Sequence, residues 1–355
     1  MAILEFFRDY ILVIVYDSFI SLLIALIIIH LFRIKDTNTK ILFLFLPIVK
    51  PFFVIIEDLN HNSYYFANRT SVLGFRLVSP NTIFERIDQL QNSPLNYSGI
   101  DTRILIVISL SIMIILLIRW LNLYFFYRRL SYDEIVTKSD IPEIFSVIDN
   151  FASRLKVPMP GVTLTHRNFF SPFVIGIKKS IIVLSPKLLD TLSGSEKEVL
   201  IAHEIAHIKR KDNLISWISL ILKDMLFFNP FSHIAYYMIR MEQEKGCDKI
   251  ILEHSSLAPK EIARNTITLI LKIKNLNSSP GRTPAADLAS NYNLLQQINY
   301  RIMDNRIKNI LDIKNKKINM NRFLKVVFFL LFLFLLAAQL LIVIKISDSS
   351  FIFLR

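Results

Sequence analysis

The residues best suited to chemistry are two histidines and a glutamate in the run His203-Glu204-Ile205-Ala206-His207. Residues four apart lie on one face of a helix, so the imidazoles of His203 and His207 can hold one metal ion while Glu204 projects beside it. A zinc ion held in this way lowers the pKa of bound water toward about 7, and a neighbouring carboxylate can accept the proton when that water attacks a peptide carbonyl. The spacing therefore predicts a zinc peptidase site in which Glu204 is the base.

The alternative is a surface helix on which the histidines are incidental. The chain has seven histidines in 355 residues, and composition alone would produce this pattern in roughly one of a hundred such chains. Local signals place the run inside a helix. Ser195 and Glu198 have capping-box spacing, apolar residues recur with helical period from Val199 to Ile208, and the basic residues 209–211 follow, where a helix C-terminus favours positive charge.

Catalytic zinc usually takes three protein ligands, so one ligand is missing from the histidine pair. The acidic residues Glu242, Glu244 and Asp248 are candidates if they lie on the same side of the membrane as the histidines. If the strongly apolar residues 213–240 crossed a bilayer once, these acids would lie on the opposite side from the histidines. Crossing twice takes about 40 residues, which is more than this segment has. We expect this segment to lie along the membrane or to dip in and return, with a turn at Asn229-Pro230.

The composition indicates a polytopic membrane protein. Hydrophobic residues make up 53% of the chain, the mean hydropathy is +0.44, and there are only seven glycines. Four apolar segments are expected to cross the hydrocarbon layer of about 30 Å; the second is short and contains two prolines. They are Tyr10–Phe32, Ile41–Ile56, Ile104–Tyr127 and Phe323–Ile344. The first is long for a signal peptide and has no small-residue cleavage site before Arg33, so we expect it to be retained.

The distribution of lysine and arginine predicts the orientation, because short positively charged loops stay on the cytoplasmic side. Residues 128–322 carry 29 Lys and Arg against 19 Asp and Glu, whereas residues 57–102 carry three arginines against five acids. We therefore expect the main domain in the cytoplasm and a loop at 57–102 outside the cell. The single cysteine, Cys247, cannot form an intrachain disulfide, which fits this placement. Nucleic-acid binding is not expected, because the basic residues flank spans and are scattered.

Short runs of β-branched and aromatic residues precede the expected metal helix. A small antiparallel sheet is the simplest arrangement for them, with Gly176 and Lys178-Lys179 as the turn elements between the second run and the third. The runs are Val162–Thr165, Phe173–Ile177 and Ile181–Leu184.

A substrate peptide is expected to bind in extended form along the edge of this sheet, because strand addition satisfies main-chain groups while leaving side chains variable. The residues expected to line this path are Phe173, Val174, Ile175 and Gly176.

Three segments carry a resemblance to a known family. The run His-Glu-Ile-Ala-His-Ile-Lys-Arg-Lys-Asp at 203–212, then Phe-Asn-Pro at 228–230, then Glu-Lys-Gly-Cys-Asp at 244–248, resembles the BlaR/MecR family of bacterial antibiotic-sensing membrane metallopeptidases. Residues 171–176, 181–186 and the pairs Arg306-Ile307 and Ile310-Leu311 are similar to other parts of that family. The two-histidine, downstream Glu-x-x-x-Asp arrangement is also similar to the HtpX-type proteases.

The resemblance implies that His203, His207 and Glu244 ligate zinc, that Glu204 is the base, and that Asp248 orients a ligand histidine. Asp212 follows His207 by five residues and would point away from the ligand face if the helix continued. It could touch the site or cap the next helix.

The family's antibiotic sensors continue beyond the last span into a penicillin-binding domain, whereas this sequence ends at Arg355. Direct β-lactam sensing is therefore not expected. We expect a separate sensor protein or the membrane state to act through the external loop at 57–102, with a constitutive protease as the alternative.

Together these observations predict an α+β membrane protein with about four transmembrane helices and a zincin-like cytoplasmic domain. The expected parts are a membrane region at 1–127, a zinc metallopeptidase domain at 128–322, and a last span with a short external tail at 323–355. The expected activity is endoproteolysis of a protein substrate at a bacterial inner membrane, in regulated proteolysis or signal transduction, with a transcriptional repressor or the chain itself as candidate substrates. The alternatives are a quality-control protease of the HtpX type and a non-catalytic membrane scaffold.

Overall fold

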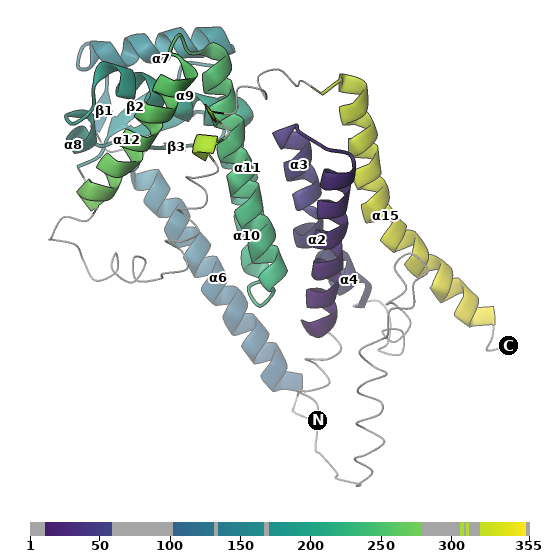
Figure 1. Ribbon diagram of the computed structural model, residues 1–355. Helices are drawn as coiled ribbons and strands as arrows, with labels where there is room; N and C mark the ends of the chain where they lie inside the picture. The colour runs from purple at the N-terminus through teal and green to yellow at the C-terminus, as the bar shows by residue number, and fades with distance from the viewer. Residues whose placement is uncertain are drawn as a thin grey trace.

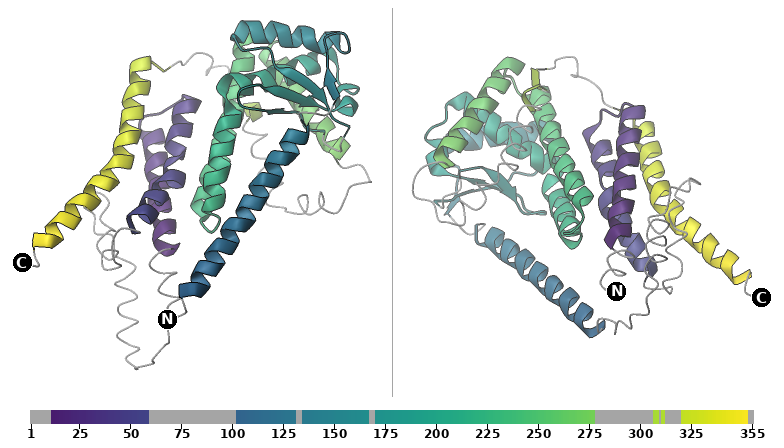
Figure 2. Two further views of the ribbon diagram at one scale, coloured as in Figure 1. Left: turned by 180° about the vertical axis from the view of Figure 1, so that it is seen from behind. Right: turned by 60° about the horizontal axis from the view of Figure 1, so that its bottom comes forward.

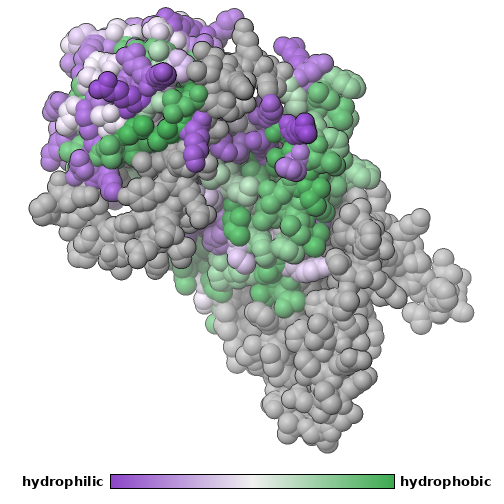
Figure 3. Space-filling view, viewed as in Figure 1, coloured by the Kyte–Doolittle hydropathy of each residue, from purple (hydrophilic) through white to green (hydrophobic). Residues whose placement is uncertain are grey.

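The computed structural model describes residues 11–58, 102–130, 134–166, 170–277, 306–308, 310–311 and 320–352. The loop expected at 57–102 lies outside the described residues except at its two ends. Within the described part, a domain built on a small sheet sits at one end of a set of long helices (Figure 1). The side chains over those helices are mostly apolar, whereas the sheet domain presents a mainly hydrophilic surface (Figure 3).

Four strands form one mixed sheet in the order β1-β2-β4-β3. The strands are β1 (Glu134–Val136), β2 (Gly161–Leu164), β3 (Phe173–Ile175) and β4 (Ile181–Leu184). The prediction of an antiparallel sheet is wrong for one pair. β3 and β4 form the expected antiparallel hairpin, but β2 pairs in parallel with β4, and β1 was not predicted. The chain places β3 on the outside of β4, so β2 and β4 become neighbours that run in the same direction.

The turn between β3 and β4 depends on Gly176. Its φ is +84°, and a Cβ there would lie 2.0 Å from the carbonyl oxygen of Lys179. Only glycine adopts this conformation without strain, so the glycine predicted in the turn is the residue that makes the hairpin close.

Helices α7 (Pro142–Leu155), α9 (Gly194–Arg210) and α12 (Pro259–Asn277) pack with the sheet around the main hydrophobic core. A short helix, α8 (Pro186–Leu189), follows β4. The apolar stripes of α7 and α9 supply fully buried core residues, among them Ile148, Ile201 and Ile205. This packing fixes α9, which carries both histidines, against the sheet.

The cap of α9 lies two residues earlier than predicted. Ser193 is the N-cap: its side chain accepts a hydrogen bond from the Glu196 amide, and the Glu196 carboxylate accepts one from the Ser193 amide. Glu198 instead accepts a hydrogen bond from Ser255. The sequence has capping-box spacing both for Ser193 with Glu196 and for Ser195 with Glu198. The helix uses the first pair, and Glu198 of the second pair is engaged in a tertiary contact.

After α9 the chain forms a hairpin of two long helices, α10 (Asp212–Met225) and α11 (Pro230–His254). Asn229 caps α11 through its side chain and Pro230 occupies the first helical turn, as is usual for proline. The turn predicted at Asn229-Pro230 is therefore present. The hairpin projects from the sheet domain alongside the helices at the N-terminus (Figures 1 and 2).

The remaining helices belong to the segments expected to cross the membrane. They are α2 (Val13–Leu31), α3 (Thr37–Leu44), α4 (Leu46–Asp58), α6 (Thr102–Leu130) and α15 (Arg322–Ile352). Among the described residues, two stretches are long and apolar enough to span a membrane, Ile14–Leu31 and Leu110–Leu130. The expected second span is formed by two consecutive helices, α3 and α4, rather than by one.

Two buried polar contacts join the first helix, α2, to its neighbours in the apolar bundle. Lys50 of α4 donates a hydrogen bond of 2.8 Å to Asp17 of α2, and both side chains are buried. Asn229 at the hairpin tip donates to Ser18 of α2. Buried polar groups in apolar surroundings require partners, so these pairs fix which helix faces meet.

Candidate active site

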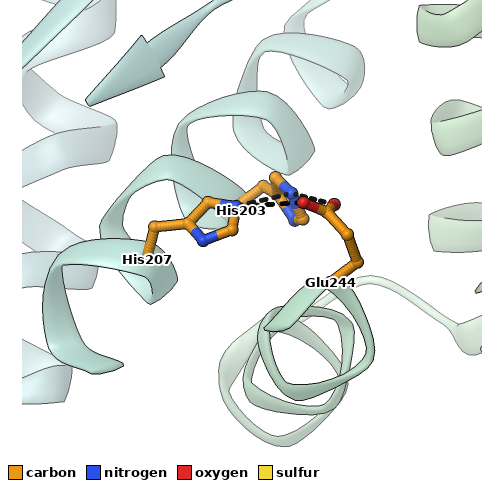
Figure 4. Close-up of side chains that lie close together, drawn as sticks. All are labelled: His203, His207 and Glu244. Atoms are coloured by element: carbon orange, nitrogen blue, oxygen red, sulfur yellow. Dashed lines mark hydrogen bonds and ion pairs between the residues drawn. The ribbon is translucent and has the colours of Figure 1, made fainter. Parts of the chain in front are cut away.

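The site forms where α11 crosses α9 (Figure 4). His203 and His207 project from one face of α9, and Glu244 reaches them from α11. His203 Nε2 lies 3.2 Å from His207 Nε2 and 3.2 Å from Glu244 Oε2, and His207 Nε2 lies 3.7 Å from Glu244 Oε1. The three residues expected as metal ligands are thus brought together at one point.

These separations fit a tetrahedral metal ion. Ligand atoms at about 2.0–2.1 Å from zinc, arranged tetrahedrally, lie roughly 3.3–3.4 Å apart. The donor chemistry agrees, because two imidazole nitrogens and a carboxylate are an ordinary ligand set for this metal. A cation at their centre would be held by His203, His207 and Glu244.

Asp212 determines the protonation of His207. Its Oδ2 lies 2.9 Å from His207 Nδ1, so Nδ1 carries the proton and Nε2 presents its lone pair toward His203 and Glu244. Burial alone would lower the pKa of His207, but the hydrogen bond to Asp212 and the charges of Glu244 and Glu204 outweigh it and raise that pKa. The surroundings of His207 are therefore negatively charged, which favours the binding of a cation.

Asp212 reaches the site because α9 does not continue. Lys211 adopts a left-handed conformation with φ +57°, and Asp212 begins α10 and turns back toward His207. Of the two roles that the sequence left open for Asp212, the structure places its side chain against the site.

Asp248, one turn after Glu244, lies near His203. Its Oδ1 is 3.7 Å from His203 Nδ1, longer than a hydrogen bond. Arg306 fills the space between these groups. It donates to both oxygens of Asp248, at 2.8 and 3.0 Å, and its Nη1 lies 3.2 Å from Glu244 Oε2. Asp248 therefore holds Arg306 in place more closely than it holds the histidine.

The arginine shifts the charge balance of the ligand carboxylate. Burial would raise the pKa of Glu244, but the hydrogen bond with His203 and the charge of Arg306 hold it well below its usual range. Glu244 is therefore an anion at neutral pH, as a metal ligand must be.

Glu204 is buried beside the ligands without belonging to them. Only 5% of the residue is exposed. Burial raises the pKa of its carboxyl group, while the neighbouring histidines lower it. A carboxylate with a raised pKa next to a metal site has the properties of a general base.

Glu242, the alternative ligand, points elsewhere. Its carboxylate contacts Lys245 at 2.7 Å and Lys40 at 3.6 Å. Because residues two apart on a helix face in nearly opposite directions, Glu242 and Glu244 cannot both face the histidines.

Cys247 is fully buried and also touches the site. Its Sγ lies 3.2 Å from His207 Nδ1 and 3.3 Å from Asp212 Oδ2. Burial and the charge of Asp212 raise the pKa of its thiol well above the usual value. The thiol is therefore neutral and unsuited to be a nucleophile.

The strand with the residues expected to bind substrate lies beside the metal helix. β3 is at the edge of the sheet, where no other described strand pairs with its outer side, and it packs against α9. Asn213, just after the metal helix, donates a hydrogen bond of 2.8 Å to the Gly176 carbonyl. Phe173, Val174, Ile175 and Gly176 are thus close to the helix that carries the site.

Two arginines near the site were not predicted as functional. Arg306 was noted only within a family resemblance, and Arg210 only as a helix-terminal charge. Arg210 Nε donates to Asp212 Oδ2 at 3.1 Å. One indication of these arginines was present in the sequence, because the acids Asp212, Glu244 and Asp248 require nearby cations once they are buried. It did not show which basic residues supply them.

The comparisons with known proteins imply the class of membrane metallopeptidases. The family described as BlaR1 peptidase M56 matches residues 41–303, and the chain belongs to this family. It is similar to the methicillin resistance mecR1 protein of Staphylococcus aureus, with 30% identity over 102 residues that cover 28% of this chain and 17% of the relative. It is also similar to the protease HtpX homolog of Gemmatimonas aurantiaca, with 30% identity over 117 residues that cover 31% of this chain and 42% of the relative. The chain thus aligns with less than half the length of either relative.

Proposed function

We propose that this protein is an integral-membrane, zinc-dependent endopeptidase. The observation that carries the proposal is the convergence of His203, His207 and Glu244 at separations suited to one zinc ion, with the buried carboxylate of Glu204 beside them. The family and the apolar helices support the membrane setting.

In this proposal Glu204 moves the protons of the reaction. A zinc ion bound at the site would lower the pKa of a coordinated water and polarise the scissile carbonyl. Glu204 accepts the proton as water attacks and delivers it to the departing amine. Asp212 keeps His207 in the tautomer that presents Nε2, and Arg306 and Asp248 position Glu244.

The membrane arrangement is part of the same proposal. We infer four spans, with the sheet domain in the cytoplasm of a bacterial cell and residues 57–102 outside. The basic excess of residues 128–322 supports this orientation. Cysteine labelling from either side of intact cells, at single cysteines introduced in residues 57–102 and at Lys187, tests it in a Cys247→Ser background.

We propose that a substrate enters as an added strand on the outer edge of β3. Backbone N–H groups of adjacent strand residues point to opposite edges, so of Val174→Pro and Ile175→Pro one removes an outward donor and the other disrupts pairing with β4. The outward variant should lower cleavage while keeping the thermal stability closer to wild type. Unchanged cleavage by both variants would exclude strand addition here.

The physiological role is proposed as regulated proteolysis or signalling, with a repressor or the chain itself as substrate. Similarity to an HtpX homolog supports quality control as the second candidate. Glu204→Gln expressed in native membranes tests the two, because proteins that bind without being cut accumulate on it. One specific soluble partner favours signalling, a broad set of damaged membrane proteins favours quality control, and capture equal to that of His207→Ala favours a scaffold.

A further inference from the structure

The N-terminus of α3 touches the end of the metal helix. α3 follows the short link after the first apolar helix and packs along α11. At its first residue, Thr37, the side-chain oxygen accepts a hydrogen bond of 3.0 Å from Arg210 Nη1. The last residue of α9 is thereby joined to a segment 173 positions away in the sequence.

Arg210 connects this contact to a ligand histidine. While Nη1 bonds Thr37, Nε donates to Asp212 Oδ2 at 3.1 Å, and that same oxygen lies 2.9 Å from His207 Nδ1. The side chains of Arg210 and Asp212 are only 7% and 3% exposed. Charge-assisted hydrogen bonds shielded from water are strong and directional, so the guanidinium is held through Nε and Nη1.

Gly246 of α11 leaves room for this guanidinium. A Cβ at Gly246 would lie 2.1 Å from Arg210 Nη1 and 2.8 Å from Nε. The arginine therefore lies against the backbone of the helix that also carries Glu244, between α3 and the site.

The same end of α3 is held from the other side. Asp36 caps α3 through Thr39 and accepts a hydrogen bond of 2.9 Å from Lys325 of α15. Helix α15 and the link from α2 thus meet one residue before the threonine that binds Arg210.

We propose that Arg210 is a positioning residue of the metal centre and that Thr37 sets its position, so that the membrane-side link at 33–37 controls the orientation of His207. The inference rests on the proposed zinc site and adds its regulation. A shift of α3 relative to α9 would break the Thr37–Arg210 bond, free the guanidinium from Asp212 and weaken the hold on the histidine.

The test measures zinc affinity by competition with a chromophoric chelator, using the full chain purified in detergent. Thr37→Val removes the hydroxyl at nearly constant shape. It should weaken zinc binding roughly 2- to 30-fold, the range for residues on a coupled network, and Thr37→Ser should restore it. Arg210→Gln should weaken binding at least as much.

Thr39→Val is the matched control, because it makes the same change on the same helix but its hydroxyl contacts Asp36 and not Arg210. It should lower thermal stability and change zinc affinity much less than Thr37→Val does, because the Thr37–Arg210 hydrogen bond is kept. In an Asp212→Asn background, Thr37→Val should have no further effect on zinc affinity, because the Thr37–Arg210 hydrogen bond acts on His207 through the Asp212 carboxylate.

The inference is overturned if Thr37→Val binds zinc as wild type does, if Thr39→Val weakens zinc binding equally, or if the effects of Thr37→Val and Asp212→Asn add. A wild-type chain that binds no zinc would instead refute the proposed function.

Discussion

Replacing Glu204 with glutamine separates catalysis from metal binding. The change keeps the shape of a side chain that is 5% exposed and lies outside the ligand set, but it removes the ability to accept a proton. We expect zinc to remain bound at wild-type stoichiometry. His207→Ala, which removes a ligand, should lose both the metal and the activity.

The magnitude follows from the role of the carboxylate. A positioned general base contributes about 10²- to 10⁴-fold, which corresponds to roughly 3–5 kcal/mol of transition-state stabilisation at about 1.4 kcal/mol per tenfold. Glu204 is buried among both histidines, Glu244 and Arg306, where solvent water is a poor substitute for the base. The loss is therefore expected in the upper half of that range.

The assay pairs metal analysis of purified variants with cleavage of fluorescence-quenched casein in detergent. Residual activity should show no dependence on added zinc. Near-normal cleavage by Glu204→Gln, or loss of its metal, would refute the reasoning that this carboxylate serves the water rather than the ion.

Three further outcomes are expected. Glu244→Ala should lose zinc whereas Glu242→Ala, which breaks only contacts with lysines, should retain it; metal analysis of both variants decides the ligand, and the reverse result would reassign it. Glu196→Gln should lower the unfolding free energy by about 1 kcal/mol at neutral pH: burial raises the pKa of Glu196, but Lys272 and Ser193 outweigh it and lower that pKa, so the stabilisation is present above the unfolded pKa of about 4.3 and lost as pH falls through the folded value. Thermal melts that show the same deficit at pH 3.5 as at pH 7 would contradict this. Lys50→Met should destabilise the helical bundle by about 3–5 kcal/mol because it leaves Asp17 buried and unpaired, while the Asp17→Leu, Lys50→Met double variant should recover most of the loss; a double variant no more stable than the single one in detergent melts would count against it.

The sequence by itself was enough to locate the helix that carries His203 and His207. The i, i+4 relation between His203 and His207 is local geometry, and any helix through them presents both imidazoles on one face. The turn at Asn229-Pro230 and the hairpin at Gly176 were also predicted, because proline and glycine restrict or free the backbone at their own positions. The long apolar segments were visible for the same reason, since hydropathy is a property of each stretch alone.

Other features depended on contacts between distant segments. The pairing of β2 with β4 is set by which strand lies outermost, and no residue in either strand encodes that order locally. The α9 cap uses Ser193 and Glu196, while Glu198 accepts a hydrogen bond from Ser255 of a distant segment, a contact that its own stretch of sequence does not reveal.

The rest of the site is decided by tertiary structure alone. Glu242 and Glu244 are alike in type and lie two residues apart, and only the packing of α11 on α9 chooses which one faces the histidines. Asp212 points into the site because the left-handed Lys211 ends one helix and begins another. Arg306 reaches Glu244 from 62 positions later in the chain, and a contact that closes so long a loop leaves no periodic trace in the sequence.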